Sequence, residues 1–147
     1  MLQGATTATS ASYDLDPGHT YSFTVSMQDS YGLRVASAPY VVALPQSSAT
    51  LRLKASPTRG RSRLLVRLWA SLASSDAATA RGGRTVRLES FDGSRWQLFG
   101  RAAQTNSTGL VRWNVRFHRG TYFVRARFAG TIDLAAATSG GVSIRVR

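Results

Sequence analysis

Apolar and polar residues alternate along most of this chain in short runs separated by turn-forming residues. In residues 21–27, Tyr21, Phe23 and Val25 share one parity, while serine and threonine hold the other. Alternation with a period of two is typical of a β-strand with one buried face. The spacing of three or four residues that indicates helices is almost absent. The pattern therefore predicts an all-β protein.

Similar alternating runs recur after residue 49 and predict an antiparallel β-sandwich. Asp92 and Gly93 separate two such runs and are a good hairpin signal, because glycine accepts the positive φ that a tight turn requires. In residues 63–72 either parity could face the core. About seven strands of this length make one sandwich of about 100 residues. The residues expected to face inward are Leu51, Leu53, Ala55, Val86, Leu88, Val111, Trp113, Val115, Phe117, Tyr122, Val124, Ala126, Phe128, Val142, Ile144 and Val146.

The charge divides unevenly between two parts of the chain. The net charge of +12 consists of −2 in residues 1–48 and +14 in residues 49–147. Two segments of such different charge are expected to be two modules. A Pro-Gln-Ser-Ser stretch between them has the composition of a linker. We place the modules at residues 1–45 and 50–147, with residues 46–49 as the linker.

The first segment carries a Leu-x-Pro-Gly-x-x-Tyr motif, an alternating strand, an Asp-Ser-Tyr-Gly turn and an Ala-Pro-Tyr-Val-Val strand. It resembles the last three strands of a fibronectin type III module. The resemblance implies that Tyr21 forms a tyrosine corner, whose hydroxyl bonds a nearby backbone group. The first half of such a module is missing, so we expect the chain to begin inside a longer protein. Alternatively, residues 1–45 complete the sheet of the second module. The matching residues are Leu15, Pro17, Gly18, Tyr21, Phe23 and Val25.

Residues 50–147 resemble a bacterial immunoglobulin-like repeat of exported actinobacterial proteins. The resemblance rests on the Trp96 hairpin, the Gly109 turn and the motif Tyr-x-x-Arg-x-x-Phe-x-Gly at 122–130. It implies an immunoglobulin-like antiparallel β-sandwich, preceded by a partial fibronectin type III-like sandwich. Such modules act as spacers, stalks or accessory binding units beside a catalytic or adhesive domain. The residues expected to be structural are Tyr21 at the corner and Trp96, Trp113, Tyr122 and Phe128 in the core.

Nothing in the sequence points to a reactive centre. His19 and His118 lie far apart, each next to a turn, and no carboxylates are spaced around them as metal ligands would be. The chain has no cysteine, no Gly-x-Ser-x-Gly motif and no phosphate-binding glycine loop. We therefore expect no catalytic residue, no metal site and no cofactor, and a function other than catalysis.

Arginine supplies 18 of the 19 basic residues, and strand parity points many of them away from the core. Outward side chains of neighbouring strands lie side by side, so some of them form a basic sheet face. Such a face attracts a polyanion, such as teichoic acid, acidic polysaccharide, anionic lipid or nucleic acid. The other interpretation is a soluble, arginine-rich surface that reflects genome composition. The candidate binding residues are Arg59, Arg61, Arg63, Arg112, Arg116, Arg125 and Arg127, with Trp69 and Phe123 as candidate exposed aromatics.

The sequence favours a non-catalytic structural, spacer or adhesion module of a secreted or cell-surface bacterial protein. The alternatives are a polyanion-binding domain that uses an arginine-rich sheet face, and an accessory domain of a secreted hydrolase. The expected partners are neighbouring domains of a longer chain and a cell-wall glycan or other polyanion. Self-association through the incomplete N-terminal module is also expected, because that module leaves strand edges unpaired. No apolar run reaches the ~20 residues of a membrane-spanning helix.

Overall fold

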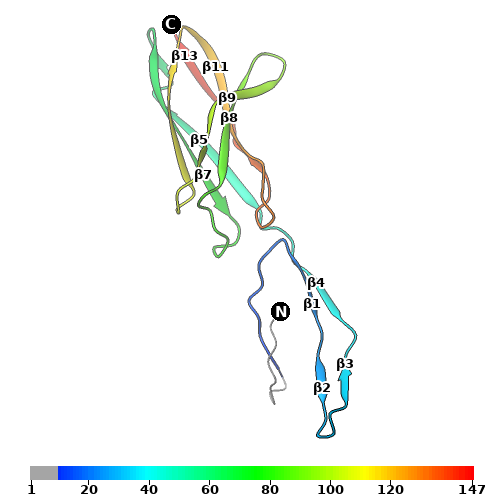
Figure 1. Cartoon of the computed structure of the whole chain (residues 1–147). Coiled ribbons are helices and arrows are strands. Elements are labelled where there is room, and N and C mark those ends of the chain that lie inside the picture. The colour runs from blue at the N-terminus through cyan, green and yellow to red at the C-terminus, as the bar shows by residue number, and fades with distance from the viewer. Residues whose placement is uncertain (1–9) are drawn as a thin grey trace.

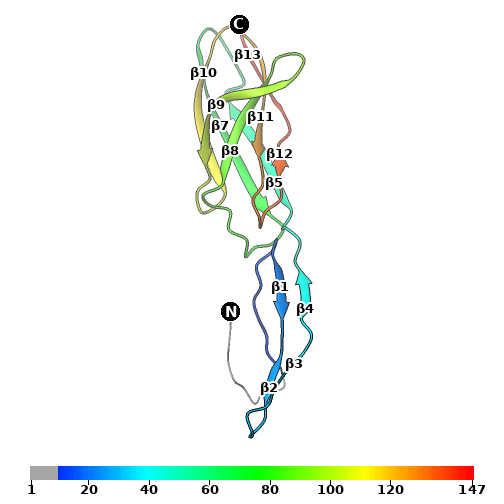
Figure 2. The same cartoon turned by 45° about the vertical axis from the view of Figure 1, so that its right-hand side comes forward.

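The computed structural model describes residues 10–147 and consists of β-strands and the loops between them, which confirms the all-β prediction. A β-sandwich holds strands β5 to β13, and a narrow ribbon of strands β1 to β4 extends from one end of it (Figure 1). The C-terminus lies at the opposite end of the sandwich (Figure 2). Residues 1–9 of the predicted N-terminal module lie outside the described residues.

One layer of the sandwich is a three-stranded antiparallel sheet with the order β10-β7-β5. The other layer has the order β6-β13-β11-β8-β9, with β12 added beside β11. In that layer β6 runs parallel to β13, and the remaining pairs are antiparallel. The strands are β5 (Ala49–Ser56), β6 (Arg59–Gly60), β7 (Leu64–Ser74), β8 (Thr85–Phe91), β9 (Trp96–Gln104), β10 (Leu110–Phe117), β11 (Gly120–Phe128), β12 (Ala137–Thr138) and β13 (Val142–Val146).

The hydrophobic core lies between these two sheets. The inward residues predicted from strand parity are either buried there or packed against the buried cluster. Strand β7 presents Val66, Leu68 and Ala70 to the core, which settles the parity that the sequence left open. Burial of large aliphatic side chains stabilises the fold by about 1.5–3 kcal/mol each. The core residues all come from positions 51–146.

The ribbon consists of two short pairs of antiparallel strands. Its large apolar side chains are mostly exposed; Met27, for example, is 72% and Tyr31 is 96% accessible. No strand before β5 joins either sheet of the sandwich in the described part of the chain, so the completion of the second module's sheet by residues 1–45 is not seen there. The paired strands are β1 (Thr20–Phe23) with β4 (Tyr40–Ala43), and β2 (Ser26–Gln28) with β3 (Arg34–Ala36).

Tyr21 makes the backbone contact that a tyrosine corner requires. Its hydroxyl accepts a hydrogen bond from the Asp16 amide at 2.9 Å and donates to the Asp16 carbonyl at 3.3 Å. The ring is half-buried, with His19 beside it at a centroid distance of 6.1 Å. The expected hydrogen bond to an upstream backbone group is therefore confirmed.

The predicted linker, residues 46–49, is bonded to the sandwich. The Gln46 side-chain amide donates to the Thr131 carbonyl at 2.6 Å. The Ser47 amide donates to the Asp133 carbonyl at 2.9 Å, and the Ser47 hydroxyl lies 3.0 Å from that of Thr79. A Cβ at Gly18 would overlap the Ile132 carbonyl, so the chain before the ribbon also touches this loop. The connection is a close contact between ribbon and sandwich, not a free tether.

Candidate polyanion-binding face

The outer surface of the β10-β7-β5 sheet carries five cations and one tryptophan. Inward residues of these strands alternate with the outward ones, so parity brings the outward residues onto one surface. We call this surface the basic face. Its cations, its tryptophan and its amide are Arg52, Lys54, Arg67, Trp69, Arg112, Asn114 and Arg116, and Leu65 lies on the same surface opposite Arg116.

Trp69 lies at the centre of the basic face. The strand register places Lys54 of β5 directly opposite Trp69 on one side and Arg112 of β10 directly opposite on the other. Directly opposed residues have Cβ atoms about 4.5–5.5 Å apart, so both cations stand within reach of the indole. Trp69 is half-buried, and a hollow of about 530 Å³ lies beside it, lined by Arg67, Arg112 and Asn114. The arrangement is a flat aromatic surface between two positive charges.

The basic face has no acidic partner within the described residues. The ion pairs of residues 10–147 join Arg84 to Asp133, Arg95 to Asp92, and Arg125 and Arg127 to Glu89. None of these involves a cation of the basic face. Its five positive charges are therefore left to solvent ions or to an anionic ligand.

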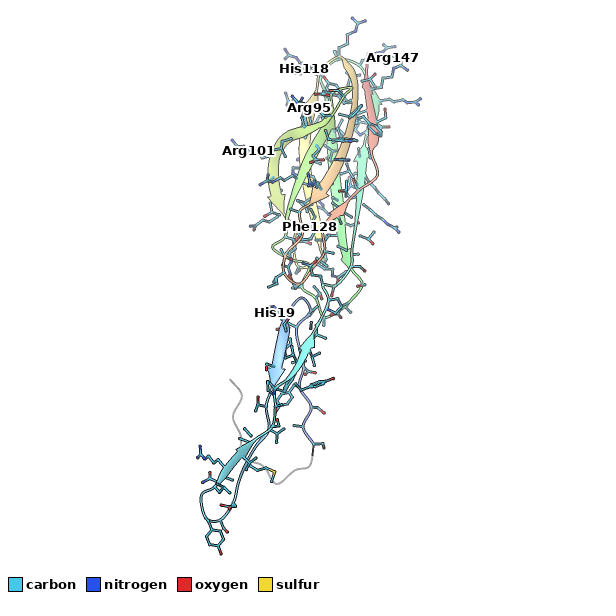
Figure 3. All side chains as sticks on the ribbon, turned by 90° about the vertical axis from the view of Figure 1, so that its right-hand side faces the viewer. His19, Arg95, Arg101, His118, Phe128 and Arg147 are labelled. Atoms are coloured by element: carbon cyan, nitrogen blue, oxygen red, sulfur yellow. The ribbon has the colours of Figure 1, made fainter. Side chains whose placement is uncertain are left out.

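The seven predicted binding arginines fall on three separate surfaces. Only Arg112 and Arg116 lie on the basic face. Arg125 and Arg127 lie on the outer surface of the other sheet, where parity places them opposite the buried residues of β11. The remaining three lie in β6 and in the turn between β6 and β7, at the end of the sandwich that carries Arg147 (Figure 3). These three are Arg59, Arg61 and Arg63.

Sequence reasoning left out Arg67 from this face and could not place Trp69. Both belong to the run 63–72, whose apolar residues occupy both parities. Only the pairing of β7 between β5 and β10 decides which side faces outward. The signal that could have found Arg67 is its spacing of two from Trp69.

Of the four aromatic residues predicted for the core, three are found there. Phe128 is buried, and Tyr122 packs edge-on against Phe117 at a centroid distance of 4.9 Å. The ring of Trp113 contacts the core, and its indole N–H donates a hydrogen bond to the Arg101 carbonyl at 3.1 Å. The prediction for Trp96 is wrong. It pairs with Phe91 across the β8–β9 hairpin, and Phe91 has the outward parity of β8.

Trp96 instead belongs to an aromatic row on the outer surface of the β6-β13-β11-β8-β9 sheet, which we call the second sheet. Its ring centroid lies 5.4 Å from that of Phe91 and 5.5 Å from that of Phe123. The Arg125 guanidinium stacks 4.0 Å from the indole centroid, a cation–π contact. Glu89 forms an ion pair with the same guanidinium at 2.7 Å. This surface is partly neutralised, unlike the basic face.

Two carboxylates away from the basic face have lowered pKa values. Hydrogen bonds from the Arg95 and Ser94 amides lower the pKa of Asp92 to about 2, because they stabilise the ionised form in the β8–β9 turn. A hydrogen bond from the Thr131 hydroxyl lowers the pKa of Asp133, with a further contribution from Arg84 at 2.5 Å. Asp133 thus links its loop to the beginning of β8.

His19 lies where the ribbon meets the sandwich, and His118 lies at the far end of the sandwich (Figure 3). Residues 10–147 contain no cluster of three or more histidine, aspartate or glutamate side chains able to hold a metal ion. A helix with the length and apolarity to span a membrane is not found in this part of the chain. The chain matches no protein-family model and no curated protein.

Proposed function

We propose that this chain is a non-catalytic adhesion module of a secreted or cell-surface bacterial protein, and that its basic face binds an acidic polysaccharide. One observation carries the proposal: Trp69 lies between Lys54 and Arg112, on a sheet face whose cations have no carboxylate partner among the described residues.

The acidic groups and the sugar rings of such a polysaccharide each have a suitable binding residue on this face. A guanidinium binds a carboxylate or phosphate with two parallel hydrogen bonds, so Arg112 suits the acidic groups. A flat indole offers a negatively polarised apolar surface to the C–H groups of a sugar ring, so Trp69 suits the ring between those groups. Two cations on β5, one on β7 and two on β10 extend the contact beyond one sugar unit.

The immunoglobulin-like and fibronectin-like identities of the two parts are also proposals. In the sandwich, β5, β7 and β10 form one sheet, while β8, β9, β11 and β13 belong to the other. If the two-residue strands β6 and β12 are left out of the count, the first, second and fifth strands (β5, β7 and β10) are divided from the third, sixth and seventh (β8, β11 and β13). This division supports an immunoglobulin-like arrangement. The hydrogen bonds of Tyr21 support the fibronectin-like interpretation of the ribbon. Modules of this kind fit the extracellular location that we propose.

A spacer is the second candidate function. It is favoured by the end-to-end arrangement of ribbon and sandwich in Figures 1 and 2. The hydrogen bonds of Gln46 and Ser47 hold the two parts at their junction. A spacer needs rigidity and length but no ligand, so binding measurements separate the two candidates.

The test uses the full chain and a fluorescent oligogalacturonate, with a neutral cello-oligosaccharide of the same length as the ligand control. We expect saturable binding of the acidic oligomer alone. Trp69→Ala should weaken it by about tenfold or more, on the scale of aromatic stacking in other polyanion sites. Trp96→Ala is the matched variant on the opposite surface and should leave binding unchanged. Equal weakening by both variants, or no binding by the natural chain, would refute the proposal. Tighter binding of oligothymidylate than of oligogalacturonate would assign the basic face to nucleic acid instead.

A further inference from the structure

Two arginines stand directly opposite each other on the outer surface of the second sheet. The register of β8 and β11 pairs Arg87 with Arg127. Their Cβ atoms are therefore about 4.5–5.5 Å apart, and like charges in this position destabilise a sheet. A soluble surface selected only for charge would gain from separating them, so the pair calls for a physical reason.

The neighbouring carboxylate of Glu89 reaches only one member of this pair. Glu89, whose side chain is 8% exposed, bonds Arg125 at 2.7 Å and reaches Arg127 only at 3.4 Å. Arg87 has no ion pair or side-chain hydrogen bond to any described residue. Two guanidinium groups thus share one carboxylate, and Arg87 keeps its donors free for a ligand.

A groove of about 490 Å³ runs over this arginine pair. Its lining includes Arg87 and Arg127 together with Leu98 from β9 and Thr85 from the same face of β8. Arg84 also lines the groove, but its guanidinium is held by Asp133 at 2.5 Å and by the Ala80 carbonyl at 2.8 Å. Glu89 also lines the groove and accepts a hydrogen bond from Arg127, so Arg87 is the arginine of the groove with no side-chain partner among the described residues.

We propose that this groove binds one tetrahedral oxyanion, a phosphate or sulfate group, clamped between Arg87 and Arg127. Each planar guanidinium can bond two oxygens in a fork, and a tetrahedral anion has enough oxygens for both forks. Its negative charge would remove the repulsion between the two arginines. The site is separate from the basic face, which lies on the other sheet. It would therefore bind its ligand without Trp69.

The test is isothermal titration of the full chain with inorganic phosphate and inorganic sulfate at pH 7 and constant ionic strength. A glucose 6-phosphate arm separates a free anion from a phosphate ester. We expect Arg87→Gln and Arg127→Gln each to weaken binding by about tenfold or more, which is the scale of a lost charge-assisted hydrogen bond. Arg145→Gln removes the same charge from β13, outside the groove, and should change affinity less than about twofold.

A second measurement, of the melting temperature, tests the repulsion between Arg87 and Arg127. Without ligand, Arg87→Gln should raise the melting temperature, and added phosphate should stabilise the natural chain more than this variant. Equal affinity of Arg87→Gln and Arg145→Gln would overturn the proposal, as would the absence of heat of binding and of a melting shift in the natural chain. Weakened phosphate binding in Trp69→Ala would move the anion to the basic face and overturn it as well.

Discussion

Removal of charge from the basic face should change how steeply polyanion binding depends on salt. The perturbation is the double variant Arg112→Gln and Arg116→Gln, both on the exposed side of strand β10. Oligothymidylate serves as the probe, because a single-stranded nucleic acid releases about 0.7 counterions for each phosphate that a protein cation neutralises. Five cations on the face, Trp69 aside, give an expected slope of log affinity against log salt of about −3.5. Loss of two cations reduces it to about −2.1.

The assay is fluorescence anisotropy between 50 and 200 mM NaCl. Over this interval the natural chain should lose affinity by about 130-fold and the double variant by about 20-fold. The control is Arg59→Gln with Arg61→Gln, which removes the same charge from β6 and the turn after it, at the end of the sandwich. The control slope should remain near about −3.5. If both double variants reduce the slope equally, net charge and not this face governs binding, and the reasoning is refuted.

Three further predictions concern the fold. Leu68→Ala empties a fully buried position and should lower the free energy of unfolding in urea by about 3–5 kcal/mol. Gly109→Ala and Gly93→Ala both place alanine at a positive φ, at a cost of about 1–2 kcal/mol each. Only the Cβ at position 109 would also overlap the Leu72 carbonyl, so Gly109→Ala should have the lower melting temperature. Because the folded chain lowers the pKa of Asp133, the ionised carboxylate stabilises the fold above the ordinary pKa of 3.8, and this stabilisation is lost as the pH falls below that value. Asp133→Asn should therefore be less stable than the natural chain at pH 7 and should lose less stability in acid.

Each of these predictions has a contrary outcome. Leu65 is 48% exposed on the same strand, and Leu65→Ala should cost much less than Leu68→Ala. Similar costs would mean that β7 does not present Leu68 to the core. Equal melting temperatures of the two glycine variants would place Gly109 away from Leu72. An unchanged acid profile in Asp133→Asn would show that the Thr131 and Arg84 contacts do not stabilise the folded chain.

Strand parity was enough to predict which residues of most strands face the core, because burial on one face imposes a period of two on the sequence. It correctly placed Val86 and Leu88, and also Val124, inside the sandwich. Parity alone has no information on which sheet a strand joins, so it could not separate Arg112 from Arg125. Those residues have the same outward parity, but they lie on opposite surfaces of the molecule.

Trp96 shows a second limit of the sequence. Strand β9 has apolar residues at both parities and a register shift against β8 between Val86 and Leu88. A shift of one residue reverses the faces of a strand, so composition cannot decide where its aromatics point. The pairing of Trp96 with Phe91 across the hairpin decides it, and that pairing follows from the length of the turn.

The parallel pairing of β6 with β13 also determines how the sandwich responds to tension along the chain. Force would enter at residues 46–48, beside the ribbon, and leave at Arg147, at the far end of the sandwich (Figures 1 and 3). It would therefore pull β6 and β13 past each other. The hydrogen bonds from Arg145 to Thr58, from Arg147 to Gly60 and from Ser62 to Arg147, at 2.8–3.1 Å, lie across that direction. They would be sheared together instead of opening one by one, so the module would resist stretching most strongly along its own length.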